Sequence, residues 1–206
     1  MVPGQRHYVL EVIVRPLLAR AFWASSGYRL RSEPLAIEGS AVLLGAPHTS
    51  NWDFAFMLAI CWRHGVAPTW LGKHTMFKRP FGPVMRALGG IPVNRAHPGR
   101  LVEDVVARLR TGRHFLVVTP EGTRARRKMW KSGFYRIARD AGLPVVLAYV
   151  DSATHTAGLG KAITLTGDVT ADMDVIRAFY ADKRGIRPEL FTPPLLREET
   201  ARPVAG

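Results

Sequence analysis

The chain has 206 residues, of which 29 are lysine or arginine and 16 are aspartate or glutamate, so its formal charge is +13. A hydrophobic fraction of 47% and a charged fraction of 22% are typical of a folded globular domain and exclude a disordered chain or a fibre. The single cysteine, Cys61, excludes a disulfide framework and a thiolate zinc site, and it is typical of a reducing compartment.

The excess of positive charge is concentrated in the middle of the chain. Residues 41–139 contain seventeen basic and four acidic side chains, whereas residues 1–40 have a net charge of +2 and residues 140–206 of −2. Because like charges repel one another in a compact fold, this local excess indicates a surface that binds an anionic partner. A nucleic acid, a membrane surface and a phosphorylated substrate are the partners that the charge admits.

The first thirty residues predict an amphipathic helix near the N-terminus. Glu11 and Arg15 lie on its polar face, and Pro16 is expected to bend or split it. Charges interrupt the apolar stretch before it reaches about 18 residues, so we expect neither a bilayer-spanning helix nor a signal peptide. The helix either packs on its own domain or lies in a membrane interface. Its apolar face consists of Leu10, Ile13, Val14, Leu17, Ala21 and Ala24.

Short apolar runs then alternate with helical patterns, which predicts an α/β fold: an αβα sandwich around a mostly parallel sheet of about seven strands. We expect one domain over residues 1–206, with 1–30 as an N-terminal helical segment and 188–206 as an irregular tail. The expected strands are Ala36–Glu38, Ala41–Ala46, Pro68–Gly72, Ile91–Asn94, Phe115–Thr119, Val145–Val150 and Ala162–Gly167. The expected helices are Asp53–His64, Phe81–Leu88, Arg100–Arg110, Ser132–Ala141 and Asp172–Lys183.

A histidine and an aspartate, His48 and Asp53, follow the apolar run that ends at Ala46. If the loop between them curls back, the carboxylate accepts the proton on one imidazole nitrogen and leaves the other nitrogen free as a base. Such a dyad can take a proton from a substrate hydroxyl, an effect worth about 10² to 10⁴ in rate. The alternative is that Asp53 only stabilises a helix N-terminus, with Asn51 as its cap, and that His48 is a packed loop residue.

A second motif places an arginine at the end of a short strand. Gly89 and Gly90 release the chain from the preceding helix, and the strand then leads to Arg95. The planar guanidinium of arginine is suited to bidentate phosphate binding. The alternative is an ordinary surface arginine.

A third motif, Thr119–Arg124, follows another apolar strand, and further cations continue as far as Lys131. An acid beside so many cations is expected to be paired, so Glu121 would shape the site or bind a substrate hydroxyl rather than act as a free base. The alternative is a solvated basic loop, which charge runs commonly form.

Taken together, these motifs resemble the glycerolipid acyltransferase superfamily, whose best-known members are the 1-acylglycerol-3-phosphate acyltransferases. The resemblance covers residues 36–151. It is carried by His48-x₄-Asp53, the strand from Gly90 to Arg95, Glu121-Gly122-Thr123-Arg124, Lys131-Ser132-Gly133 and Gly142-Leu143-Pro144-Val145-Val146.

The resemblance implies transfer of a fatty acyl group from acyl-CoA or an acyl-carrier protein to a hydroxyl of an anionic lysophospholipid-type acceptor, 1-acylglycerol-3-phosphate foremost. It implies that His48 is the general base, that Asp53 orients it, and that Arg95 and Arg124 bind the acceptor's phosphate. It implies no metal and no cofactor besides the thioester co-substrate. The further residues that it assigns to the acceptor pocket are Glu121, Gly122, Thr123 and Lys131.

The same resemblance implies a peripheral or monotopic position on the cytoplasmic face of the cell membrane, in the manner of a compact bacterial branch of the family. The chain departs from the family pattern at Pro92 and Asn94 in the second motif. These departures leave the chemistry in place and keep a glycolipid or another lysolipid open as the acceptor.

Three other classes of function compete with this interpretation. The charge admits a nucleic-acid-binding protein, although no helix-turn-helix, zinc finger or aromatic RNA platform is present in the sequence. A catalytically silent lipid-binding protein on the same fold is a second alternative, against which the intact His48–Asp53 pair argues. Thiol chemistry at Cys61 is a third, and its apolar helical surroundings favour a buried, inert thiol.

Overall fold

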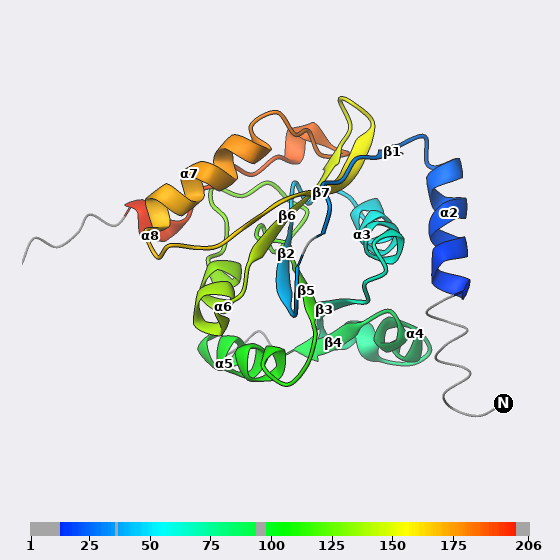
Figure 1. Ribbon diagram of the computed structural model, residues 1–206, viewed down its shortest axis with the longest axis horizontal. Coiled ribbons are helices and arrows are strands. Elements are labelled where there is room, and N and C mark those ends of the chain that lie inside the picture. The colour runs from blue at the N-terminus through cyan, green and yellow to red at the C-terminus, as the bar shows by residue number, and fades with distance from the viewer. Residues whose placement is uncertain (1–12, 36, 94–97, 201–206) are drawn as a thin grey trace, which may run out of the picture.

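A seven-stranded sheet forms the centre of the molecule, as the computed structural model of residues 13–35, 37–93 and 98–200 shows (Figure 1). The strand order is β1-β7-β6-β2-β5-β3-β4, and every neighbouring pair is parallel except β6 and β7. This arrangement confirms the predicted α/β class and the mostly parallel sheet. The strands are β1 (Arg29–Leu30), β2 (Ala41–Gly45), β3 (Pro68–Lys73), β4 (Gly90–Val93), β5 (Phe115–Val118), β6 (Val145–Asp151) and β7 (Thr156–Ile163).

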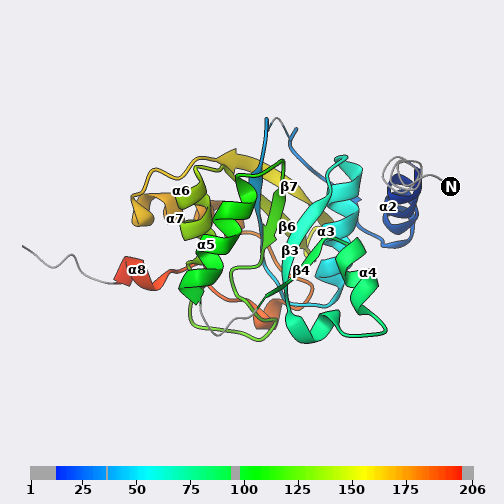
Figure 2. The same cartoon turned by 90° about the horizontal axis from the view of Figure 1, so that it is seen from below.

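Helices cover both faces of the sheet. Figure 2 shows α5, α6 and α7 on one side and α3 on the other, with α2 and α4 beyond it. No helix of the described residues is long and apolar enough to cross a membrane. The helices are α2 (Arg15–Ser25), α3 (Trp52–Arg63), η2 (His74–Phe77), α4 (Gly82–Ala87), α5 (Pro98–Leu109), α6 (Gly133–Ala141), α7 (Val169–Tyr180), η3 (Pro188–Leu190) and α8 (Arg197–Thr200).

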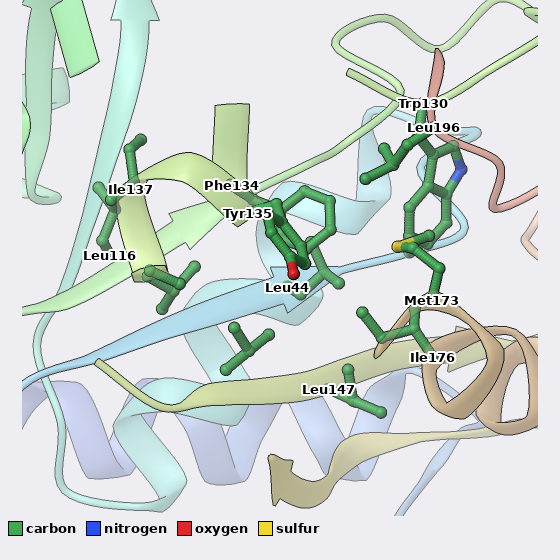
Figure 3. Packing of buried hydrophobic residues seen from close by; sticks show 14 of the residues in the cluster. Leu44, Leu116, Trp130, Phe134, Tyr135, Ile137, Leu147, Met173, Ile176 and Leu196 are labelled. Atoms are coloured by element: carbon green, nitrogen blue, oxygen red, sulfur yellow. The ribbon is translucent and has the colours of Figure 1, made fainter. Parts of the chain in front are cut away.

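The alternation of side chains along β2 divides the core into two layers. Leu44 faces α6 and α7, where Phe134 and Ile176 are fully buried (Figure 3). Leu43 faces the opposite way and packs with Phe56 of α3. Each such buried side chain stabilises the fold by about 1.5–3 kcal/mol relative to an exposed one, so the central strands are held from both faces.

The N-terminal helix packs through a different face from the one that the sequence pattern predicts. Phe22 and Trp23 of α2 contact Phe56 of α3, with ring centroids 4.9 and 5.9 Å apart. Leu17, on the predicted apolar face, is 56% exposed. Pro16 lies in the first turn of α2, where its missing N–H breaks no hydrogen bond within that helix. Two residues of the predicted pattern, Leu10 and Glu11, lie outside the described residues.

The predicted strand Ala36–Glu38 is wrong over its described part, residues 37 and 38. The main-chain N–H groups of Arg31 and Glu33 instead donate to carbonyl groups of β7. The N–H of Arg29 donates to the carbonyl of the residue directly before β7. This earlier segment occupies the free edge of β7, so residues 37 and 38 have no edge with which to pair. Pro34 then follows, and its lack of an N–H ends the pairing.

The predicted strand Ala162–Gly167 is displaced, because β7 covers Thr156–Ile163. Two glycines in β7 weaken the apolar pattern there, and each marks a close approach by another element. A Cβ on Gly158 would lie 2.0 Å from the Arg31 carbonyl oxygen, and one on Gly160 would lie 2.2 Å from the Phe179 ring.

The other predicted elements differ from the structure at their ends. The last predicted helix begins earlier, at Val169, where the Asp168 side chain caps it by accepting the Ala171 N–H at 3.1 Å. The tail predicted as irregular contains η3 and α8, and the described residues end at Thr200.

Candidate active site

The loop between β2 and α3 places His48 at the carboxyl end of the sheet. β2 ends at Gly45, and α3 begins at Trp52, so residues 46–51 form a short connection over this edge. Ligands of parallel α/β sheets bind at the carboxyl ends of the strands, which makes this loop the expected position for a site.

Asp53 holds the imidazole of His48 in one orientation. His48 Nδ1 lies 3.0 Å from Asp53 Oδ2, and the same oxygen accepts the main-chain N–H groups of Thr49 and Ser50, each at 2.8 Å. With an ionised carboxylate as its partner, Nδ1 carries a proton and Nε2 is left free to accept one. Asp53 also lies in the first turn of α3, where the helix dipole favours its negative charge.

Glu121 lies directly behind this loop rather than among the exposed cations. Its Oε1 accepts the main-chain N–H of His48 at 3.0 Å, and the side chain is only 3% exposed. Burial raises the pKa of Glu121 to about 7, against the lowering effect of the His48 hydrogen bond. Glu121 therefore holds the main chain of the His48 loop through this hydrogen bond, which the sequence pattern did not predict.

Thr123, Arg124 and Lys131 line a cavity of about 1180 Å³ together with His48 and Asp53. Arg124 and Lys131 are exposed at this surface. Gly122, which also lines the cavity, has a φ of +66°, and a Cβ there would lie 3.1 Å from the Lys131 side chain. The third motif therefore brings two cations to the same cavity as the dyad. Arg95 of the second motif lies outside the described residues.

The cavity also has an apolar part that the sequence pattern did not identify as functional. Leu43 of β2, Met57 and Ile60 of α3, and Val150 of β6 line it. Met57 and Ile60 are three residues apart on one helical face directly after the His48–Asp53 motif, which is the signal that could have indicated them. A cavity that joins an imidazole, cations and an apolar wall can hold a molecule with an anionic head and a hydrocarbon chain.

Two other chemistries find little support at this site. Cys61 also lines the cavity, but it is buried, and burial raises the pKa of its thiol to about 12, so it stays protonated near neutral pH. Among residues 13–35, 37–93 and 98–200, no three His, Cys, Asp or Glu side chains are grouped so that they could hold a metal ion.

Comparisons with known proteins bear on the fold and on the family of this chain. The crystal structure of PlsC, the 1-acyl-sn-glycerophosphate (LPA) acyltransferase from Thermotoga maritima, is similar in fold, with a TM-score of 0.60. It has 18% sequence identity to this chain, and the match covers 84% of this chain and 77% of that one. No match was found among curated protein sequences. The family model described as Acyltransferase matches residues 29–150, more than half of the chain, and the protein therefore belongs to this acyltransferase family.

Proposed function

We propose that this acyltransferase moves a fatty acyl group from an acyl thioester, acyl-CoA or acyl-carrier protein, to a hydroxyl of 1-acylglycerol-3-phosphate or a related lysophospholipid. The observation that carries the proposal is the 3.0 Å contact between His48 Nδ1 and Asp53, which leaves Nε2 free on a side chain that lines the cavity. The structurally similar Thermotoga maritima protein is an LPA acyltransferase, which supports this choice of acceptor.

In the proposed reaction, His48 Nε2 takes the proton of the acceptor hydroxyl while that oxygen attacks the thioester carbonyl carbon. The attacking oxygen and this carbon must lie within about 3–3.5 Å of each other in the bound complex. The tetrahedral intermediate then collapses, the carbon–sulfur bond breaks, and His48 returns the proton to the leaving thiolate. The products are the ester and a free thiol. Asp53 stabilises the imidazolium that exists between the two proton transfers.

The cations of the third motif are proposed to hold the acceptor's phosphate. Arg124 and Lys131 line the cavity and have no ion-pair partner among the described residues, so their charge is available to an anionic ligand. Arg95 is proposed for the same role on the family resemblance alone. Thr123 offers a hydroxyl at the same wall. The acyl chain is assigned to the apolar part, beside Met57 and Ile60.

The protein is further proposed to work at a membrane surface, on the cytoplasmic face of the cell membrane, because its acceptor is a lipid. Support comes from α2, on which Leu17 and Leu18 are 56% and 52% exposed. On and beside α4, Phe81 and Val84 are 69% and 53% exposed. Arg15 of α2 donates to the Ala87 carbonyl of α4 at 3.4 Å, so the two elements are adjacent. Exposed apolar side chains with cations beside them suit an anionic lipid surface.

The proposal is tested by assaying the purified protein with one acyl-CoA and one acyl-carrier-protein thioester against a panel of lysophospholipids and glycolipids. Product esters are measured by mass spectrometry. We expect ester formation on 1-acylglycerol-3-phosphate and its loss in His48→Ala, while circular dichroism shows that this variant remains folded. Wild-type turnover in His48→Ala would overturn the mechanism, and a preference for a glycolipid would overturn the acceptor.

A further inference from the structure

The segment 184–187 contacts the His48 loop, although it lies beyond residues 29–150, which the family model matches. The main-chain N–H of Arg187 donates to the Thr49 hydroxyl at 3.0 Å. Thr49 is 2% exposed and is the neighbour of His48 in the chain. The segment therefore reaches the site through a buried residue that the catalytic motif leaves unspecified.

Gly185 is in closer contact still with this loop. A Cβ at Gly185 would lie 2.6 Å from the Thr49 hydroxyl oxygen, 2.9 Å from its methyl carbon and 3.1 Å from Pro47 Cβ. Thr49 is β-branched and buried, so it has little freedom to move away from an added methyl group. Only glycine lets the segment lie this close to the loop.

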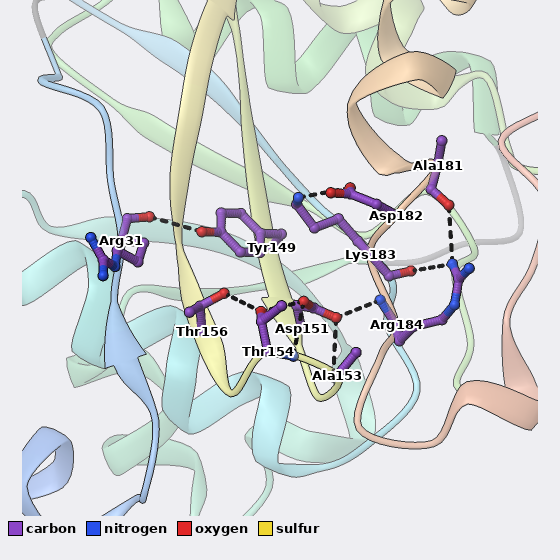
Figure 4. A network of polar contacts seen from close by, with 10 residues as sticks. All are labelled: Arg31, Tyr149, Asp151, Ala153, Thr154, Thr156, Ala181, Asp182, Lys183 and Arg184. Carbon is purple, nitrogen blue, oxygen red and sulfur yellow. Dashed lines mark hydrogen bonds and ion pairs between the residues drawn. The ribbon is translucent and has the colours of Figure 1, made fainter.

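The segment is itself fixed to the turn between β6 and β7. Asp151 Oδ1 accepts the main-chain N–H of Arg184 at 2.8 Å, and the same carboxylate binds the turn residues Ala153 and Thr154 (Figure 4). Ser152 adds two bonds, from its N–H to the Arg184 carbonyl at 2.6 Å and from its hydroxyl to the Gly185 carbonyl at 2.8 Å. The contact with Thr49 is therefore made by a segment that a buried carboxylate holds in place.

Thr49 connects the segment 184–187 to the His48–Asp53 pair through a hydrogen bond, so a displacement of the segment also affects the pair. Its N–H donates at 2.8 Å to Asp53 Oδ2, the same oxygen that contacts His48 Nδ1. A shift of Thr49 would therefore change the position or the hydrogen bonding of the carboxylate that orients the imidazole. Misplacement of a reacting group by about 1 Å can cost about 100-fold in rate, so a small shift is enough to matter.

We infer that Thr49 is a positioning residue, and that the segment 184–187, through the Arg187 N–H and Gly185, fixes the orientation of His48 from outside the matched family region. This inference rests on the proposed role of His48 as the general base. It assigns to the C-terminal part of the chain a contribution to the rate of acyl transfer rather than to substrate affinity.

The first test compares Thr49→Val with Thr49→Ser. Valine keeps the shape but removes the acceptor of the Arg187 N–H, whereas serine keeps the hydroxyl. We expect kcat to fall at least about tenfold in Thr49→Val, with both KM values nearly unchanged, and Thr49→Ser to recover most of the loss. Ser40→Ala is the matched control, because this buried hydroxyl accepts the His114 N–H at 2.9 Å at the opposite end of β2. It should lower stability and leave kcat unchanged.

The second test uses glycine substitutions. Gly185→Ala should lower kcat in the same way, since its methyl group pushes against Thr49. Gly112→Ala is the control, because the nearest atom to a Cβ there is the His114 ring at 3.4 Å. The inference is overturned if Thr49→Val keeps wild-type kcat, if serine fails to recover it, or if the losses appear in KM. An active His48→Ala variant would instead overturn the proposed function itself, so the two failures are distinguishable.

Discussion

The main-chain N–H of His48 donates a 3.0 Å hydrogen bond to the carboxyl group of Glu121, which lies 73 positions further along the chain. The other carboxyl oxygen of Glu121 is buried without a hydrogen-bond partner in the described structure. The loop that presents the imidazole is thus held by a side chain that follows a different strand. Burial makes this side chain, the carboxyl group of Glu121, hard to ionise.

This burial predicts a specific pH dependence of stability. The pKa of Glu121 is raised from 4.5 to about 7 by burial, so between these values the folded state binds more protons than the unfolded one. Its contribution to the free energy of unfolding therefore falls as pH rises from 4.5 to 7 and is constant outside this window, with a total change on the order of 3 kcal/mol at most. In Glu121→Gln, the free energy of unfolding should no longer show this decline between pH 4.5 and about 7. Denaturant titrations between pH 4 and about 8 measure it, and parallel profiles for both proteins would contradict the prediction.

Asp53→Asn tests the orienting carboxylate. The change keeps the size of the side chain but removes the charge that stabilises a protonated His48. We expect kcat to fall by about 10² to 10⁴ with small changes in KM, measured by steady-state acyl transfer. Asp140→Asn is the control, because this exposed acid pairs with its neighbour Arg139 and does not line the cavity. A variant of Asp53 with wild-type kcat would show that the dyad is structural.

Arg124→Ala tests the proposed phosphate contact. Loss of a charge-assisted hydrogen bond to the acceptor should raise the acceptor KM by about tenfold or more and leave the thioester KM nearly unchanged. Arg113→Ala removes an arginine whose side chain contacts the Gly39 carbonyl and the Phe115 ring instead, and it serves as the control. Equal effects of the two substitutions on the acceptor KM would remove the role assigned to Arg124.

Leu17→Glu tests the membrane surface. A charge on the exposed face of α2 should weaken binding to vesicles of anionic phospholipid, because it would have to be buried in the interface. Co-sedimentation with vesicles measures the bound fraction. Val175→Glu is the matched control, since Val175 is 40% exposed on α7, on the other side of the sheet. If both variants bind like the wild type, α2 is not the contact surface.

Contacts within a single motif were predicted more readily than contacts between segments far apart in the chain. His48 and Asp53 are five residues apart, and this spacing together with the family resemblance predicted the contact that the structure shows. The buried central strands β2, β5 and β6 were predicted near their observed positions, because each is a continuous apolar run. The edge strand β1 was missed, because its place depends on pairing with residues of β7 more than a hundred positions further along the chain. The strand β7 was misplaced, because Gly158 and Gly160 weaken its apolar pattern.

By itself, then, the sequence determined the α/β class, because hydrophobic periodicity is a property of neighbouring residues. The resemblance of its motifs indicated the family and predicted the contact between His48 and Asp53. Only the tertiary structure decided that Glu121 supports the His48 loop, that Gly185 lies against Thr49, and that α2 leaves Leu17 exposed. These contacts join segments far apart in the chain. They are set by which surfaces pack together in the folded protein, and no local pattern of residues specifies that choice.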